Sequence, residues 1–176
     1  MRSDRLPELN ELESEALVRI QSVALQLPRV QQGSRLLSHF GEHALGWLGT
    51  AAAGAAFDEK RRRQWVAMGV AAFTSHAASV VIKRIVRRRR PTDPRITVGV
   101  ATPSTLSFPS SHSTSGTAAL VSLAQLSRSP LPLAGIPVMM MSRMVLGVHY
   151  PSDTVLGAAI GAATAGVVHE IERRTR

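Results

Sequence analysis

The chain contains no cysteine, few aromatic residues and few acidic residues. Without cysteine it has no disulfide, no thiolate metal site and no cysteine nucleophile. Aromatic side chains make up 4% of the 176 residues, which leaves few stacking platforms for single-stranded nucleic acid. The 12 acidic residues face 21 basic ones, and the net charge of +9 predicts an anionic partner.

Charged side chains are also missing from several long runs of the sequence. No Asp, Glu, Lys or Arg occurs in 43–57, 64–82, 96–127, 129–142 or 154–169. A helix that crosses the hydrocarbon core of a bilayer needs about 20 apolar residues. Basic clusters at 60–63, 83–90 and 172–176 adjoin these runs, as juxtamembrane residues do. The pattern favours a membrane protein over a soluble helical bundle or a nucleic-acid-binding protein, whose basic face lies on a soluble fold.

We therefore expect an all-α fold, a polytopic membrane helix bundle that forms a single domain over 1–176. Residues 7–27 carry apolar side chains at three- and four-residue spacing and are too charged to span, which predicts an amphipathic surface helix. The transmembrane core, 35–170, contains about five spans. They are expected near 35–57, 64–83, 112–128, 130–148 and 153–170. The connection 84–111 is rich in Pro, Thr and Ser and is expected to be an ordered active-site loop.

Three polar segments interrupt the apolar pattern, and this map places all of them at one end of the bundle. They are Lys83 with Arg90 and Pro91, Pro109 to His112, and Ser142 and Arg143 with His149 and Asp153. Two histidines, an aspartate and three cations suit phosphoryl transfer. Guanidinium and ammonium groups hold phosphate oxygens, one histidine attacks phosphorus and the other protonates the leaving oxygen.

Two predicted helix starts support these roles. A proline suits the first turn of a helix, so the proline at 151 places Asp153 in that turn, where it can accept a ring N–H from His149. Ser110 is a natural N-cap of the next apolar helix, whose first amides form an anion site. Arg143 and His149 would lie about 240° apart on an ideal helix, so the helix must end or unwind near Gly147.

These residues resemble the type 2 phosphatidic acid phosphatase family, a group of metal-free membrane lipid phosphatases. The family signature is Lys, six residues, Arg-Pro; then Pro-Ser-Gly-His; then Ser-Arg, five residues, His, three residues, Asp. The chain matches it in order and spacing, except that Ser111 replaces the usual glycine. The resemblance implies that His149 is the nucleophile, that Asp153 orients it and that His112 is the general acid, with no cofactor and no metal. The phosphate-binding residues that it implies are Lys83, Arg90, Arg143, Ser110 and Ser111.

A second constellation, His39, Glu42 and His43, matches the inverted zinc-protease pattern HxxEH. Zinc would need a third ligand, and acidic residues are scarce farther along the chain. We expect these residues, together with Arg87, to contact the substrate headgroup. Segment 38–47, in a small Ala- and Arg-rich chain, is similar to actinobacterial phosphatases that dephosphorylate decaprenylphosphoryl 5-phosphoribose. That resemblance implies the same lipid as substrate, in the synthesis of the arabinan precursor.

Other functions stay open at this point, namely a polyprenyl pyrophosphate phosphatase, a phosphatidylglycerophosphate phosphatase, a vanadate-dependent haloperoxidase-like enzyme and a non-enzymatic membrane protein.

His76 is expected to pack within its helix. The expected partners are the lipid phosphate and a bilayer with anionic lipids, not nucleic acid, and the oligomeric state is unknown from the sequence. The acidic N-terminal segment lacks an apolar signal, so we expect a bacterial plasma-membrane protein whose site faces the cytoplasm. Arginines beyond the signature suggest a second anionic group or acidic lipid: Arg84, Arg87, Arg88 and Arg89.

Overall fold

The computed structural model describes residues 5–175, with side chains from Glu8 onward. Within this part of the chain the fold is helical, with one isolated β-bridge between Arg89 and Leu106. The elements are α1 (Arg5–Ala24), α2 (Val30–Gly41), η1 (Glu42–Ala44), α3 (Leu45–Phe57), η2 (Glu59–Arg61), α4 (Arg62–Val86), α5 (Ser111–Ser127), η3 (Leu131–Ala134), α6 (Gly135–Val145) and α7 (Pro151–Arg174). The predicted all-α class is confirmed.

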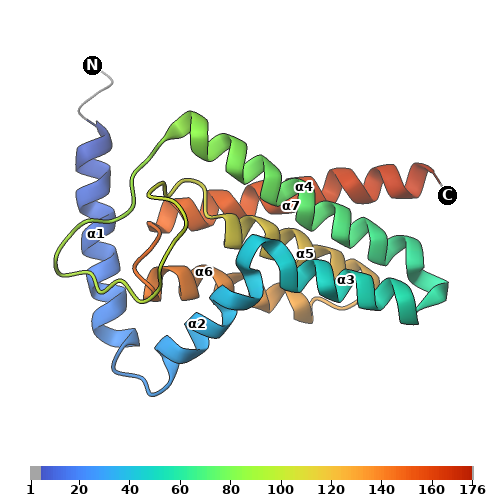
Figure 1. Ribbon diagram of the computed structural model, residues 1–176, viewed down its shortest axis with the longest axis horizontal. Helices are drawn as coiled ribbons and strands as arrows, with labels where there is room; N and C mark the ends of the chain where they lie inside the picture. Colours follow the sequence, from blue (N-terminus) through green and yellow to red (C-terminus); the bar gives the residue numbers. More distant parts are fainter. Residues whose placement is uncertain (1–4, 176) are drawn as a thin grey trace.

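The long helices α4, α5 and α7 run along the longest axis of the molecule, and α5 packs against both of the others (Figure 1). Helix α6 contacts α5 and α2, and α3 lies along α4. Helix α1 crosses the end of this bundle where α7 begins, and the segment between α4 and α5 folds over the same end (Figure 1). The N-terminal amphipathic helix therefore packs across the bundle instead of running along it.

Small residues bring α5 and α7 into close contact. A Cβ on Gly157 would lie 2.9 Å from the Ser110 carbonyl oxygen, and one on Gly161 would lie 2.1 Å from the Thr114 carbonyl oxygen. Both glycines face backbone, which cannot move aside as a flexible side chain can. Such small-residue contacts are typical of helix pairs within a bilayer, where close approach increases van der Waals packing.

Two helical segments, Glu59–Val86 and Pro151–Arg174, are long and apolar enough to cross a membrane. Large apolar side chains such as Phe73 and Val155 are exposed on them, as lipid-facing side chains would be. The count of five spans stays a prediction.

The first predicted span, 35–57, is wrong as a single helix. Helix α2 ends at Gly41, and α3 begins at Leu45. Between them His43 and Ala44 adopt positive φ values of 49° and 61°, so the chain changes direction at η1. The span expected over 130–148 is also shorter, because a 3₁₀ turn precedes α6 and the helix ends at Val145.

The expected break near Gly147 is confirmed. Gly147 has a φ of +67°, and a Cβ there would lie 2.5 Å from the Thr97 carbonyl oxygen, so both conformation and space favour glycine. The turn carries His149 to the start of α7, with Asp153 in the first turn of that helix. Ser110 is the N-cap of α5, as predicted. These local features place the candidate site at one end of the bundle.

Candidate active site

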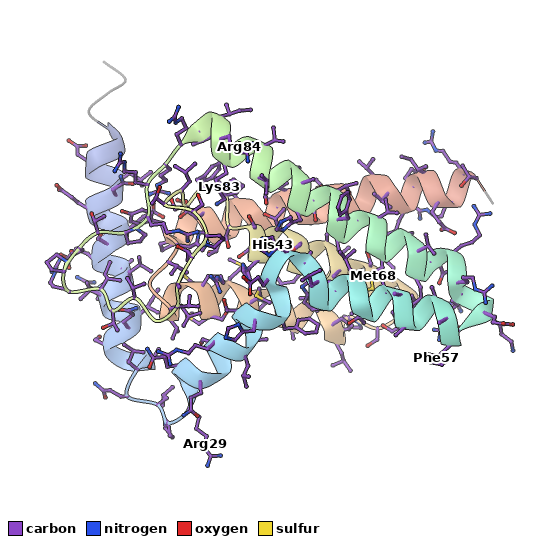
Figure 2. All side chains as sticks on the ribbon, viewed as in Figure 1. Arg29, His43, Phe57, Met68, Lys83 and Arg84 are labelled. Atoms are coloured by element: carbon purple, nitrogen blue, oxygen red, sulfur yellow. The ribbon has the colours of Figure 1, made fainter. Side chains whose placement is uncertain are left out.

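A cavity of about 490 Å³ opens at the end of the bundle near α1. Lys83 and Arg84 lie in the last turns of α4, and His43 lies at the break between α2 and α3 (Figure 2). The polar and charged side chains that line this cavity are Ser38, His39, Glu42, His43, His76, Lys83, Arg84, Arg90, Thr102, Ser104, Ser111, His112, Arg143 and His149. The structure thus brings the three polar segments of the sequence together with the His39–His43 segment.

His149 is 2% exposed, and its two ring nitrogens have different surroundings. Nε2 lies 3.2 Å from Nη1 of Arg90. Because a guanidinium only donates, Nε2 must accept, and the neutral ring then carries its proton on Nδ1. Burial lowers the pKa of His149 well below its ordinary value, and the nearby cations, Arg90 first, lower it further. The ring is therefore neutral, and the lone pair of Nε2 accepts from Arg90; to act as a nucleophile, Nε2 must exchange this contact for phosphorus.

Asp153 is fully buried beside this histidine. Its Oδ2 accepts a hydrogen bond of 2.9 Å from the backbone N–H of Tyr150, and its Oδ1 accepts one of 2.9 Å from Arg88. The distance from Oδ2 to His149 Nδ1 is 3.7 Å, so the predicted hydrogen bond is not formed in this structure. The carboxylate instead caps the start of α7 and lies close enough to attract positive charge on the ring.

Arg143 and Arg90 present buried positive charge to the cavity. Arg143 is 2% exposed, and its Nε and Nη1 have no hydrogen-bond partner among the described residues. Arg90 donates to the carbonyls of Ser104 (2.8 Å) and Val148 (2.6 Å). Burial lowers the pKa of Arg90 to about 10, which still leaves it charged at neutral pH. Buried guanidinium groups that lack acidic partners favour the binding of an anion such as phosphate.

Lys83 supports the loop that leads into α5. Its Nζ donates to the carbonyls of Pro109 (2.9 Å), Ser107 (3.1 Å) and Leu106 (3.3 Å). These contacts use the three N–H donors of an ammonium group. Lys83 therefore acts on an anion in the cavity as a nearby point charge and fixes the loop at the same time.

The start of α5 separates the roles of its two serines. Ser110 is fully buried and does not line the cavity, and its Oγ accepts from the N–H of Ser113, so its phosphate contact stays a prediction. Its side chain serves as the N-cap. Ser111 lines the cavity, and its Oγ accepts a 2.8 Å hydrogen bond from Ser79. Ser111 begins α5, so this position has helical backbone and does not need glycine.

His112 is held from the opposite side by the end of α2. Its Nε2 lies 2.9 Å from the Ser38 carbonyl oxygen, which only accepts, so the ring donates. A Cβ on Gly41 would lie 2.7 Å from Cδ2 of His112. The sequence did not predict this contact, because no local pattern relates α2 to the start of α5.

His39, Glu42, His43 and His76 form the part of the cavity wall that we call the histidine wall. The rings of His43 and His76 have centroids 6.0 Å apart. His76 was expected to pack in its helix, but it lines the cavity, and its Nδ1 is buried without a hydrogen-bond partner in the described part of the chain. Residues 5–175 contain no group of three or more His, Cys, Asp or Glu side chains that could hold a metal ion, so the HxxEH residues have no third ligand there.

The arginines that exceed the signature differ in position. Arg84 lines the cavity, whereas Arg87 is exposed and does not line it, so the structure does not bring Arg87 to the cavity and its headgroup contact stays a prediction. Arg87 adopts a φ of 55° as the C-cap of α4, and its N–H bonds the Lys83 carbonyl. Arg88 contacts Asp153 and does not line the cavity.

Comparisons with known proteins agree with this geometry. A protein of Mycolicibacterium smegmatis named decaprenylphosphoryl-5-phosphoribose phosphatase is 55% identical over 145 residues, which cover 82% of this chain and 81% of that protein. A protein of the same name from Mycobacterium tuberculosis is 48% identical over 155 residues, 88% of each chain.

Two solved structures share the fold. The first transmembrane PAP2 type phosphatidylglycerolphosphate phosphatase from Bacillus subtilis has a TM-score of 0.73 at 20% identity, covering 99% of this chain and 90% of that chain. LpxE of Aquifex aeolicus has a TM-score of 0.72 at 16% identity, covering 90% of this chain and 95% of that chain. The family model described as the PAP2 superfamily matches residues 64–176. These matches confirm the resemblance that the signature residues carry, and the chain belongs to the PAP2 superfamily.

Proposed function

We propose that the protein is a membrane phosphatase that hydrolyses the phosphate monoester of decaprenylphosphoryl 5-phosphoribose. The products are inorganic phosphate and decaprenylphosphoryl ribose, a precursor for arabinan. The observation that carries the reaction is that His149 and Arg143 line the same cavity. His149 is neutral and has a lone pair on Nε2, and Arg143 has guanidinium nitrogens without a hydrogen-bond partner in the described residues. The names of the relatives that cover more than four fifths of the chain support the substrate.

In the first step Nε2 of His149 attacks phosphorus while Arg143, Arg90 and Lys83 stabilise the phosphoryl oxygens. The bond between phosphorus and the sugar oxygen breaks, and its electron pair stays on that oxygen. His112 enters this step as the imidazolium: its Nε2–H stays on the Ser38 carbonyl, and its Nδ1 donates the proton that converts the departing alkoxide to a hydroxyl. The ring of His149 becomes positively charged in the phosphohistidine, and the Asp153 carboxylate at 3.7 Å stabilises that charge.

In the second step water attacks the phosphohistidine. His112, now neutral, accepts a proton from the water. The bond between phosphorus and Nε2 breaks, its electron pair returns to the nitrogen, and inorganic phosphate leaves. The cations that hold the phosphoryl oxygens neutralise the charge of the dianion, so the reaction has no step assigned to a metal ion.

The histidine wall fits the sugar of the substrate. Glu42 accepts hydrogen bonds from hydroxyl groups, and imidazole nitrogens can both donate and accept them. The wall lines the same cavity as the phosphate-binding cations, and the buried Nδ1 of His76 has no hydrogen-bond partner in the described part of the chain. We assign His39, Glu42, His43 and His76 to the pentose, and Arg84 to a second anionic group of the lipid.

Basic side chains at both ends of the long helices support a position across a bilayer. Arg62 and Arg63 begin α4, Arg173 and Arg174 end α7, and at the other end of α4 Arg84 and Arg90 line the cavity. Such clusters bind anionic headgroups at a bilayer surface. We place the protein in the bacterial plasma membrane with the cavity on the cytoplasmic side, where a phosphorylated-sugar lipid would be made.

A phosphate-release screen of the purified protein in detergent tests this function. The substrates are decaprenylphosphoryl 5-phosphoribose, a polyprenyl pyrophosphate and phosphatidylglycerophosphate, each with EDTA present. We expect release from the first lipid, no loss in EDTA, and an acid-labile phosphoenzyme that His149→Ala abolishes. Preference for either other lipid would replace the substrate, and activity that needs added Mg²⁺ would contradict the mechanism.

A further inference from the structure

Arg88 makes all of its side-chain contacts away from the phosphate-binding cations. Its guanidinium donates to Oδ1 of Asp153 (2.9 Å), to Oγ of Ser152 (2.7 Å) and to Oε2 of Glu13 (2.5 Å). It also donates to Oδ1 of Asn10 and lies 4.0 Å from the centroid of the Tyr150 ring. The side chain is 10% exposed, so these contacts form in a nearly dry environment.

Glu13 links this arginine to the N-terminal helix. It lies on α1, is buried, and besides Arg88 it accepts hydrogen bonds from the backbone N–H of Ser152 (2.7 Å) and from its Oγ (2.9 Å). Both acceptor oxygens of Glu13 are therefore used at the start of α7. Helix α1, which crosses the end of the bundle in Figure 1, is attached to the turn that carries His149 and Asp153.

Along these contacts, from α1 to His149, negative and positive side chains alternate. Glu13 is negative, Arg88 positive and Asp153 negative, and the ring of His149 becomes positive when its Nε2 bonds phosphorus. A buried carboxylate costs free energy unless a cation or hydrogen-bond donors accompany it. Arg88 is the one cation that an ion pair joins to Asp153 in the described residues. Without Arg88 the carboxylate keeps the backbone N–H of Tyr150 but loses its charged partner, which favours its protonated form and weakens its attraction for a charged ring.

We infer that Arg88, held by Glu13 of α1, is a positioning residue that keeps the Asp153 carboxylate charged and directed at His149. This inference rests on the proposed function, because it assumes that His149 is the nucleophile. It makes the N-terminal helix part of the catalytic machinery, and it separates Arg88 from the arginines that hold phosphate. Residues that hydrogen-bond a metal-ligating side chain change affinity or activity by about tenfold to a hundredfold when they are removed, and we expect the same range for Arg88 beside Asp153.

The test measures kcat and KM of the purified enzyme on p-nitrophenyl phosphate and on decaprenylphosphoryl 5-phosphoribose, with inhibition by inorganic phosphate as a measure of anion binding. We expect Arg88→Gln to lower kcat by about tenfold to a hundredfold on both substrates, with KM and the phosphate inhibition constant within about twofold of wild type. Arg88→Lys, which keeps the charge, should recover part of the loss. Glu13→Gln should lower kcat less than Arg88→Gln does but by at least about threefold, because glutamine loses the negative charge that faces Arg88 and keeps an oxygen acceptor.

Glu11→Gln and Arg19→Gln are matched controls, since both side chains are exposed on the same helix α1, and both should leave kcat unchanged. If Arg88→Gln does not fold, Glu13→Gln decides the question. A kcat within about twofold of wild type in the folded variants would overturn the inference. A loss of kcat/KM that comes from a higher KM and a higher phosphate inhibition constant would also overturn it, because Arg88 would then act in binding. Wild-type activity on p-nitrophenyl phosphate without activity on the lipid would remove the proposed substrate alone, whereas inactivity on both would reject the proposed function.

Discussion

Replacing Gly41 by alanine tests how the general acid is positioned. The new Cβ would lie 2.7 Å from Cδ2 of His112, whereas two carbon atoms in contact are about 3.5–4.0 Å apart. The backbone of Gly41 has φ −84° and ψ −1°, which alanine adopts without strain. The substitution therefore acts through the contact alone, and the ring must move by about 1 Å, which disturbs the 2.9 Å hydrogen bond between its Nε2 and the Ser38 carbonyl.

The size of the effect follows from the role of the acid. A displacement of about 1 Å in a catalytic group costs about a hundredfold in rate, or about 2.7 kcal/mol of transition-state stabilisation. We expect kcat on the lipid substrate to fall about a hundredfold, because its alkoxide leaving group needs a proton. On p-nitrophenyl phosphate, whose leaving group is stable as an anion, the fall should be less than about tenfold.

Gly33→Ala is the matched control. Gly33 lies on the same helix α2, and a Cβ there would have no atom within 4 Å, so its activity should equal that of wild type. Thermal unfolding of both variants shows whether the fold is retained. An unchanged Gly41→Ala enzyme, or one that loses the same factor on both substrates, would refute the assignment of His112 as a general acid held by α2.

Three further predictions concern the nucleophile, the sugar and the membrane. Burial and the nearby cations hold the pKa of His149 below its ordinary value of 6.5, so the ring stays neutral as the pH falls through 6.5. The rate of phosphoenzyme formation should therefore begin to fall only below that pH, and a fall that begins at 6.5 or above would contradict this. His76→Phe should raise KM for the pentose lipid several-fold and leave p-nitrophenyl phosphate unaffected, and an equal change for both would remove the sugar contact. In the cysteine-free chain, an impermeant maleimide applied to intact cells should label Lys60→Cys but not Thr97→Cys, both of which are exposed, and the reverse result would place the cavity outside.

Much of the site could be predicted because its residues obey local rules. Ser110 precedes an apolar helix and caps it, and the proline at 151 begins α7 and brings Asp153 next to His149. The mismatch between Arg143 and His149 on a straight helix required the break that Gly147 provides. The spacing of the signature then placed the phosphate-binding cations in one cavity.

Features that depend on long-range contacts were not predictable in this way. Gly41 ends α2, but glycines also occur inside the neighbouring helices, at Gly33, Gly46 and Gly49, so this glycine alone did not mark the break at His43. The hydrogen bond from His112 to Ser38 and the ion pair from Arg88 to Glu13 join residues that are 74 and 75 positions apart. His76 has small, uncharged neighbours in the sequence, and the packing of α4 against η1 brings it to the cavity.

The unpaired guanidinium of Arg143 has a consequence for the search for inhibitors. Buried charge without a partner lowers the stability of the folded state, so Arg143→Met should give an inactive protein that unfolds at a higher temperature. For the same reason, a dianion that binds the native cavity stabilises the fold, by about 2.7 kcal/mol at a hundred times its dissociation constant. Melting temperature can then rank phosphate mimics directly, with no need for a lipid substrate that is difficult to prepare.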